Sequence, residues 1–247
     1  MSLTYAMWTL MQRGRDVLYP DQCLVCGEST DRPNAICGVC WGSLSVCDGL
    51  CCGKCGVPLP GEEQEDDVLC GECLVHNRPW IAGASATIYD GPSRRLVLSL
   101  KHHDRLEVAD FAADLLVSAR KRLPEESAVL VPIPLHWRRL LVRNFNQAEL
   151  LAARLAQRVE TDLFCSDVLA RRRYHPPMKD VSRAERISRL ENVFEVVRSD
   201  VIEGRLVILV DDVMTTGATL ADATRACYAS GARGVCVLAL ARAAKDA

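Results

Sequence analysis

The sequence lacks several features that are typical of membrane proteins and secreted proteins. Its 247 residues contain no run of 18 apolar residues, so we expect no membrane-spanning helix. Residues 1–20 lack the basic start, apolar centre and small-residue cleavage site of a secretory signal, so we expect a cytoplasmic protein. The net charge of −2 gives the whole chain no electrostatic bias toward nucleic acid or membrane. The expected class is therefore a cytoplasmic globular protein, whose apolar content of 49% allows a substantial core.

Cysteine, in contrast, is abundant and unevenly distributed. Ten of the 13 cysteines fall within residues 23–73, a stretch with too little aliphatic periodicity to form a hydrophobic core of its own. Eight of them form CxxC pairs, which in chain order give the tetrads Cys23, Cys26, Cys37, Cys40 and Cys52, Cys55, Cys70, Cys73. Two CxxC turns complete a tetrahedral Zn²⁺ site, and in a chain without an export signal metal is favoured over disulfides. We predict two structural zinc sites, while an interleaved pairing of the tetrads and an iron–sulfur cluster remain alternatives.

The rest of the chain alternates between strand patterns and helix patterns. Five strands are expected, at residues 84–89, 128–133, 192–197, 206–212 and 234–241. Four helices are expected, at residues 92–100, 107–123, 145–159 and 220–230. This alternation predicts an α/β fold with a parallel sheet flanked by helices. We divide the chain into a helical lead-in (1–20), a cysteine-rich module (21–78) and an α/β domain (79–247).

The most informative stretch is VILVDDVMTTGATL, at residues 207–220. An apolar strand, expected to be buried on both faces, ends in Asp211 and Asp212. The hydroxyl-rich turn at residues 215–219 precedes a helix, where backbone N–H groups and the helix dipole favour a phosphate. Carboxylates at the end of such a strand can accept hydrogen bonds from sugar hydroxyls or help to hold Mg²⁺. The alternative is an ordinary strand–helix turn with two solvated acids.

This stretch resembles the phosphoribosyl-diphosphate (PRPP) signature of type I phosphoribosyltransferases. The resemblance implies that Asp211 and Asp212 hold the ribose hydroxyls and form the catalytic centre. It also implies that Mg²⁺ binds together with PRPP. The 5′-phosphate would be bound by the loop residues Thr215, Thr216, Gly217, Ala218 and Thr219.

A second segment, at residues 131–156, completes a resemblance to the ComF/GntX-like family, which joins a double zinc ribbon to a type I phosphoribosyltransferase domain. The matching motifs are V-P-x-P at residues 131–134 and R-G-F-N-Q, written RNFNQ at residues 143–147. The amides of the last two residues fit a helix start, where they would cap the helix or orient a ligand. Arg138 and Arg143 are expected to bind the diphosphate of PRPP, as guanidinium groups can do bidentately. Lys101 is also expected to reach the diphosphate. The alternative for Lys101, Arg138 and Arg143 is that each is an ordinary solvated surface residue.

The chain departs from the family pattern in several places. The glutamine of the family's Thr/Gln-containing segment falls near Met178, and residues 192–194 (NVF) stand where the family has G-A-F. Asn144 replaces the glycine of R-G-F-N-Q, and Arg189 stands where the family has the asparagine of R-x-x-N. The resemblance therefore implies a pocket for PRPP, and it leaves open whether the phosphoribosyl group is transferred to a nitrogen nucleophile.

The charge distribution supports a different function. Residues 136–190 contain twelve Lys and Arg against six Asp and Glu, with Trp137, Phe145 and Tyr174 available to stack on bases. The family resemblance also implies a part in DNA uptake during competence. The alternative is thus a non-catalytic or nucleotide-sensing protein that binds single-stranded DNA or DNA-uptake proteins.

Overall fold

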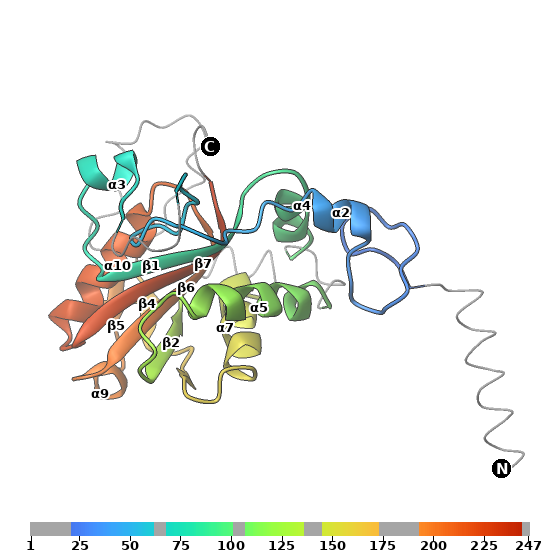
Figure 1. Cartoon of the computed structure of the whole chain (residues 1–247). Helices are drawn as coiled ribbons and strands as arrows, with labels where there is room; N and C mark the ends of the chain where they lie inside the picture. The colour runs from blue at the N-terminus through green and yellow to red at the C-terminus, as the bar shows by residue number, and fades with distance from the viewer. Residues whose placement is uncertain (1–20, 62–67, 101–106, 136–144, 173–192, 244–247) are drawn as a thin grey trace, which may run out of the picture.

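The protein is built around one parallel sheet. The computed structural model describes residues 21–61, 68–100, 107–135, 145–172 and 193–243. The sheet has the order β1-β7-β6-β2-β3, and every neighbouring pair in it is parallel (Figure 1). Its strands are β1 (Ala82–Ile88), β2 (Ala128–Pro132), β3 (Leu163–Phe164), β6 (Leu206–Met214) and β7 (Gly234–Arg242). The predicted α/β fold with a parallel sheet flanked by helices is confirmed.

Helices cover both faces of the sheet and create two hydrophobic cores. One core lies under α4 (Gly91–Ser99), α5 (Glu107–Arg120) and α7 (Gln147–Ala156), and the other lies under α10 (Ala218–Ala229). The side chains of β6 alternate between them: Ile208 faces the first core, whereas Val207 and Leu209 face the second. A strand that is buried on both faces needs apolar residues at every position, which is why its sequence is a continuous apolar run.

A second, two-stranded sheet lies beside the main one. The strand predicted at residues 192–197 is β5 (Phe194–Val196), which pairs antiparallel with β4 (Leu169–Arg171) and precedes the short helix α9 (Ser199–Ile202). The strands β3 and β4 are not predicted from the sequence, because two or three residues are too few to show a periodicity. The carboxylate of Asp222, buried on α10, accepts hydrogen bonds from the backbone N–H groups of Val193 (2.8 Å) and Phe194 (3.1 Å). This contact fixes the start of β5 against α10.

The cysteine-rich module packs against the edge strand β1, and its two halves join different cores. Leu24 and Leu44 belong to the core under α4, α5 and α7. Cys52, Cys55 and Cys73 belong to the core under α10. The short helices of the two halves, α2 (Gly38–Gly42) and α3 (Gly71–Val75), accordingly lie far apart in Figure 1.

Glycines allow the second half of the module to lie directly on β1. A Cβ on Gly83 would lie 2.2 Å from the carbonyl oxygen of Lys54, and a Cβ on Gly56 would lie 2.2 Å from the backbone nitrogen of Ser85. The backbone N–H of Gly83 also donates to the carbonyl of Gly53 (2.8 Å). Because the two backbones touch, a side chain at either glycine would separate them.

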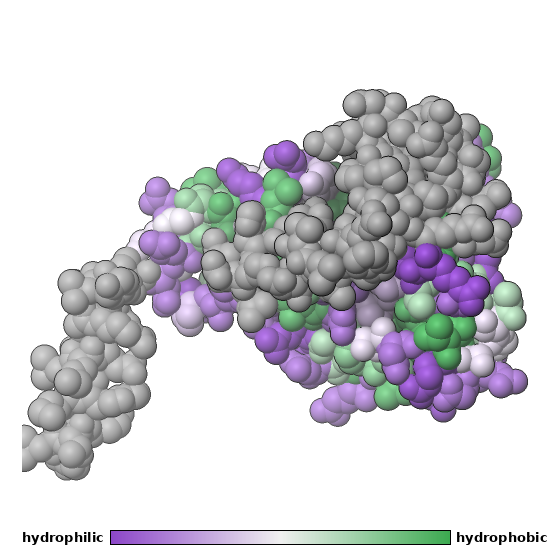
Figure 2. Space-filling model, turned by 180° about the vertical axis from the view of Figure 1, so that it is seen from behind, coloured by the Kyte–Doolittle hydropathy of each residue, from purple (hydrophilic) through white to green (hydrophobic). Residues whose placement is uncertain are grey.

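The surface of the protein carries both hydrophobic and hydrophilic residues. On the face shown in Figure 2, the coloured residues form small hydrophobic groups separated by hydrophilic ones. Within the described ranges, no helix is long and apolar enough to cross a membrane.

Candidate functional site

The centre of the sheet contains a crevice at the carboxyl ends of β2 and β6. These strands are neighbours, but β6 leads through α10 to β7 on one side, whereas β2 leads through α7 to β3 on the other. The two helices also cover opposite faces of the sheet. Neighbouring strands whose connections depart in opposite directions leave a gap at their carboxyl ends, and open α/β proteins bind ligands there. This is the edge at which the sequence places Asp211 and Asp212.

A pocket of about 190 Å³ occupies the crevice. It is lined by residues from the end of β2, the start of α7, β4, the end of β6 and the start of α10: Ile133, Pro134, Leu135, Asn146, Gln147, Ala148, Arg171, Asp211, Asp212 and Thr219. The structure therefore brings together Asp211, Asp212 and Thr219, three of the residues expected to bind PRPP. Residues 215–217 form the turn that leads from β6 into α10, and Ala218 is the first residue of the helix.

The two carboxylates are held in place by their own backbone. The N–H of Asp212 donates to Oδ1 of Asp211 (2.9 Å), and the N–H of Val213 donates to Oδ1 of Asp212 (2.8 Å). Burial raises the pKa of the Asp211 carboxyl well above its ordinary value, the negative charge of Asp212 adds to this effect, and Arg171 opposes it. A carboxyl with a raised pKa beside a second acid is an environment that hydroxyl donors or a cation would stabilise, as expected at a binding site.

The turn between β6 and α10 is shaped to bind an anion. Gly217 is the N-cap of α10, with φ +75°, a backbone conformation that favours glycine. The hydroxyl of Thr216 accepts a hydrogen bond from the N–H of Ala218 (3.3 Å). The N–H groups of the first helical turn have no acceptor within the helix, and the dipole of this 12-residue helix adds positive potential at the same point. Together these groups suit a phosphate.

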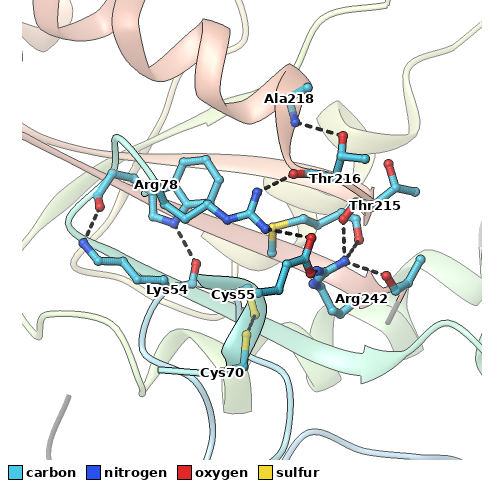
Figure 3. A network of polar contacts seen from close by, with 12 residues as sticks. Lys54, Cys55, Cys70, Arg78, Thr215, Thr216, Ala218 and Arg242 are labelled. Atoms are coloured by element: carbon cyan, nitrogen blue, oxygen red, sulfur yellow. Dashed lines mark hydrogen bonds and ion pairs between the residues drawn. The ribbon is translucent and has the colours of Figure 1, made fainter. Parts of the chain in front are cut away.

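Two buried arginines bind the carbonyl oxygens of this turn from behind (Figure 3). Nη1 of Arg242 donates to the carbonyls of Met214 (3.1 Å) and Thr215, and Nη1 of Arg78 donates to the carbonyl of Thr216. Three consecutive peptide groups therefore have a fixed orientation. The sequence gives no signal for either arginine, because Arg78 lies 138 positions before Thr216 and Arg242 lies 27 positions after Thr215.

Several of the expected cationic ligands fall outside the described residues, namely Lys101, Arg138 and Arg143, as do Asn144 and Arg189. Within the described residues, Arg171 lines the pocket, with its guanidinium carbon 5.4 Å from the centre of the Phe194 ring. Its sequence signal was its position at the start of a run of three arginines, at residues 171–173.

Asn146 has a structural role at the wall of the pocket. Its Oδ1 accepts from the N–H of Ala148 (3.2 Å) as the cap of α7, and its Nδ2 donates to the carbonyl of Ile133 (3.0 Å). These bonds hold the start of α7 against the end of β2, so Asn146 builds the wall of the pocket.

The eight CxxC cysteines form two compact groups with the composition expected from chain order. The groups are Cys23, Cys26, Cys37, Cys40 and Cys52, Cys55, Cys70, Cys73, and within each group the sulfur atoms lie within 4.8 Å of one another. The alternative, interleaved pairing is not observed. The Sγ atoms of Cys26 and Cys37 are 3.7 Å apart, as are those of Cys55 and Cys70. Tetrahedral zinc with Zn–S bonds of about 2.3 Å requires a sulfur–sulfur distance of about 3.8 Å.

The donor sets therefore fit one Zn²⁺ each. A cluster of several irons would hold its cysteines on different metal ions and farther apart, so the spacing favours zinc over an iron–sulfur cluster. Burial acts to raise the pKa of Cys23, but hydrogen bonds from the backbone of Cys37, Cys26 and Val25 outweigh it and lower the pKa to about 6. In the second tetrad, hydrogen bonds from the thiols of Cys55 and Cys73 lower the pKa of Cys52. Each tetrad thus stabilises one thiolate, the form that binds metal.

The parallel sheet, with an acid pair and an anion-binding turn at its central crevice, defines a phosphoribosyltransferase-type domain preceded by two zinc ribbons. The family models agree with this description: "Double zinc ribbon domain" matches residues 15–74, and "Phosphoribosyl transferase domain" matches residues 146–247. The chain is 31% identical over 216 residues to the DNA utilization protein YhgH of Escherichia coli, covering 82% of this chain and 91% of the relative. The chain belongs to the ComF/GntX-like family.

Two further relatives share this organisation. Competence protein F of Haemophilus influenzae is 28% identical over 232 residues, covering 85% of this chain and 98% of the relative. Competence protein ComFC of Bacillus subtilis is 30% identical over 210 residues, covering 79% of each. Among solved structures, adenine phosphoribosyltransferase from Thermoanaerobacter pseudethanolicus superimposes with a TM-score of 0.35 and 15% identity over 56% of this chain and 82% of that one. That superposition is too loose to transfer the role of any residue.

Proposed function

We propose that the crevice between β2 and β6 binds a 5-phosphoribosyl ligand, PRPP together with Mg²⁺, in a cytoplasmic protein. The observation that carries the proposal is the placement of an acid pair and an anion-binding turn around one pocket, with Asp211, Asp212 and Thr219 all in its lining. An ordinary strand–helix turn with two solvated acids does not account for a pocket that brings both acids together with the first turn of a helix.

Each part of the ligand has a matching group in the crevice. Asp211 and Asp212 would accept hydrogen bonds from the ribose hydroxyls. The hydroxyl and N–H groups of residues 215–219 would bind the 5′-phosphate. The pocket volume of about 190 Å³ is below the 300–1,000 Å³ typical of pockets that enclose a whole ligand. We therefore assign the pocket to the phosphoribosyl part and place the diphosphate outside it.

The diphosphate requires cations. Arg171 is the described cation in the pocket lining, and we assign it to a phosphate group of the ligand. Lys101, Arg138 and Arg143 remain proposed ligands of the diphosphate. Bound Mg²⁺ would neutralise part of the diphosphate charge. In a transfer reaction, a nitrogen lone pair would form a bond to C1 of the ribose, the C1–O bond would break, and diphosphate would leave with both bonding electrons.

Titration calorimetry with PRPP and Mg²⁺ tests the binding site. Asp212→Asn removes the charge that would receive a ribose hydroxyl, which is worth about 1.5–3 kcal/mol, so we expect binding weaker by about 10–100-fold. Arg171→Gln is expected to weaken binding by about tenfold or more. Its matched control is Arg172→Gln, because Arg172 is the next residue but is exposed and pairs with Glu195. Equal affinities in all four proteins, or no binding in the wild type, would refute the proposed site.

Transfer activity needs a separate assay, since a phosphoribosyl pocket does not by itself establish catalysis. Release of diphosphate from PRPP can be followed by ³¹P NMR in the presence of purine bases, pyrimidine bases and ammonia. A product peak that is absent in Asp212→Asn would identify the protein as a phosphoribosyltransferase. Binding without any product would support the alternative of a nucleotide sensor.

The second candidate function is a part in DNA utilisation. It is favoured by the names of the relatives, a DNA utilization protein and two competence proteins. The basic surplus of residues 136–190 supports binding to single-stranded DNA. Fluorescence anisotropy with a labelled oligonucleotide tests this candidate: binding must be present at low salt and must weaken steeply as salt is raised. No binding at low salt, or binding that is indifferent to salt, would exclude it.

A further inference from the structure

Two buried arginines and a partly exposed glutamate form a charge network that joins the second cysteine tetrad to the anion-binding turn. Glu72 lies on α3 between two members of the tetrad, Cys70 and Cys73. Its Oε2 lies 2.5 Å from Nη2 of Arg242, and its Oε1 lies 3.5 Å from Nη2 of Arg78. One carboxylate of the zinc ribbon thus pairs with the two arginines that bind the turn.

The other end of each guanidinium reaches the turn itself (Figure 3). Nη1 of Arg242 donates to the carbonyls of Met214 and Thr215, and Nη1 of Arg78 donates to that of Thr216. The side chains of Arg78 and Arg242 are only 5% and 2% exposed. Two almost fully buried guanidinium groups therefore lie between the zinc ribbon and the turn.

The tetrad is also connected to the turn by packing. A Cβ on Gly217 would lie 2.6 Å from Nη1 of Arg78 and 3.0 Å from the Trp80 ring, so the turn lies directly against both side chains. The Trp80 indole N–H donates to the carbonyl of Lys54 (2.7 Å), and Lys54 Nζ donates to the carbonyl of Trp80 (2.7 Å). Lys54 lies between Cys52 and Cys55, so both CxxC turns of the second ribbon are connected to the wall behind the turn.

The carboxylate of Glu72 compensates the charges of the two buried arginines. Two buried guanidinium groups that face the same turn repel each other, and removing the carboxylate between them would leave uncompensated buried charge. The carboxylate keeps its position through α3, which has only five residues, with Cys70 as its N-cap and Cys73 within it. A module without a core of its own depends on metal for its folded geometry. The position of Glu72 therefore depends on the metal in the second tetrad.

The first tetrad provides an internal comparison. Val39 stands between Cys37 and Cys40 where Glu72 stands between Cys70 and Cys73, so the first ribbon has no carboxylate at this position. The first ribbon has a glutamate at Glu28, but its side chain is exposed, and this half of the module packs on the opposite core, away from α10. The two ribbons thus share their donor chemistry, and only the second has a carboxylate between the cysteines of a CxxC turn.

We propose that Glu72 is a positioning residue for the phosphate-binding turn, and that it links occupancy of the second zinc site to binding of the phosphoribosyl ligand. This inference rests on the proposed function of the turn. The second ribbon is then a structural part of the binding site, and the first ribbon is not. Because linkage is reciprocal, a ligand on the turn must also retain the zinc of the second tetrad.

The first measurement needs no ligand. Hydrogen–deuterium exchange of the backbone at residues 213–220 is compared among the zinc-loaded wild type, Glu72→Gln and the matched control Glu28→Gln. We expect exchange about tenfold faster in Glu72→Gln only, with the zinc content unchanged in all three proteins. Exchange in Glu72→Gln equal to that of the control would overturn the inference. Loss of zinc from Glu72→Gln before any local change would also overturn it, since the residue would then serve the ribbon alone.

The second measurement uses PRPP with Mg²⁺ and follows the release of zinc to a colorimetric chelator. Saturating PRPP is expected to slow the release of one of the two zinc ions by about fivefold or more in the wild type and in Glu28→Gln. The effect should be absent in Glu72→Gln. If calorimetry detects no PRPP binding to the wild type, the proposed function fails. If PRPP binds but protects neither zinc ion, the inference fails while the proposed function stands.

Discussion

Replacing Gly217 by alanine should destabilise the protein far more than a comparable change elsewhere. Gly217 has φ +75°, and a Cβ there would lie 2.6 Å from Nη1 of Arg78 and 3.0 Å from the Trp80 ring. The atoms to be displaced belong to a buried arginine that donates to the carbonyl of Thr216. The substitution therefore disturbs the backbone, the packing and a charged hydrogen bond together.

The magnitude follows from these parts. The left-handed backbone costs alanine about 1–2 kcal/mol relative to glycine. Loss of a hydrogen bond from a charged donor costs about 1.5–3 kcal/mol. We therefore expect Gly217→Ala to lower the free energy of unfolding by about 3–5 kcal/mol, and to weaken the binding of ribose 5-phosphate because the turn is displaced.

Gly204→Ala is the matched control. Gly204 also has a left-handed backbone, with φ +68°, but a Cβ there would meet no atom within 4 Å. Only the backbone cost of about 1–2 kcal/mol applies to it. Urea unfolding of both variants, followed by the fluorescence of buried Trp80 and by circular dichroism, gives the comparison. A loss in Gly217→Ala no larger than that in Gly204→Ala would refute the close packing of the turn against Arg78.

Three further predictions concern other parts of the chain. Asp211→Asn should stabilise the ligand-free protein at about pH 7–8, because a carboxyl with a raised native pKa makes folding less favourable as pH rises above its unfolded value. The gain in thermal midpoint should shrink on acidification toward about pH 4. A gain independent of pH would contradict the raised pKa of Asp211. Asp162→Asn leaves the buried Arg120 without its carboxylate partner at 2.7 Å and should lower the free energy of unfolding in urea by about 3–5 kcal/mol. The control Asp167→Asn removes a partner from an exposed ion pair and should have little effect. Similar losses in the two variants would contradict the burial of the first pair. Metal analysis should find about two zinc ions per chain, and removing them with a chelator should unfold the cysteine-rich module. A zinc-free protein with an unchanged near-ultraviolet circular dichroism spectrum would contradict the structural role of the metal.

The architecture was predictable where the sequence pattern is long. The apolar runs at residues 206–210 of β6 and 235–241 of β7 are typical of strands covered on both faces, which implies a parallel sheet with two helical layers. The strands β3 and β4 have two and three residues, and their pairing depends on the neighbours that the fold brings to them. The antiparallel pairing of β4 with β5 therefore had no signal in the sequence.

The site was predictable where its residues are contiguous. Asp211, Asp212 and residues 215–219 lie within nine positions of one another, so one strand and one turn are enough to bring them together. Arg78 reaches Thr216 from 138 positions away, and the sequence around it has no feature that indicates the contact. The spacing permits other pairings of the CxxC turns besides chain order, and only the three-dimensional arrangement distinguishes them.

The central claim is that the crevice between β2 and β6 binds the phosphoribosyl group of PRPP. A crystal structure of the protein with PRPP and Mg²⁺, at a concentration that calorimetry shows to be saturating, tests this claim most directly. We predict that the 5′-phosphate is bound by the N–H groups of residues 215–219 and that the ribose hydroxyls are bound by Asp211 and Asp212. PRPP bound elsewhere on the protein, with the crevice free of ligand, would contradict the account.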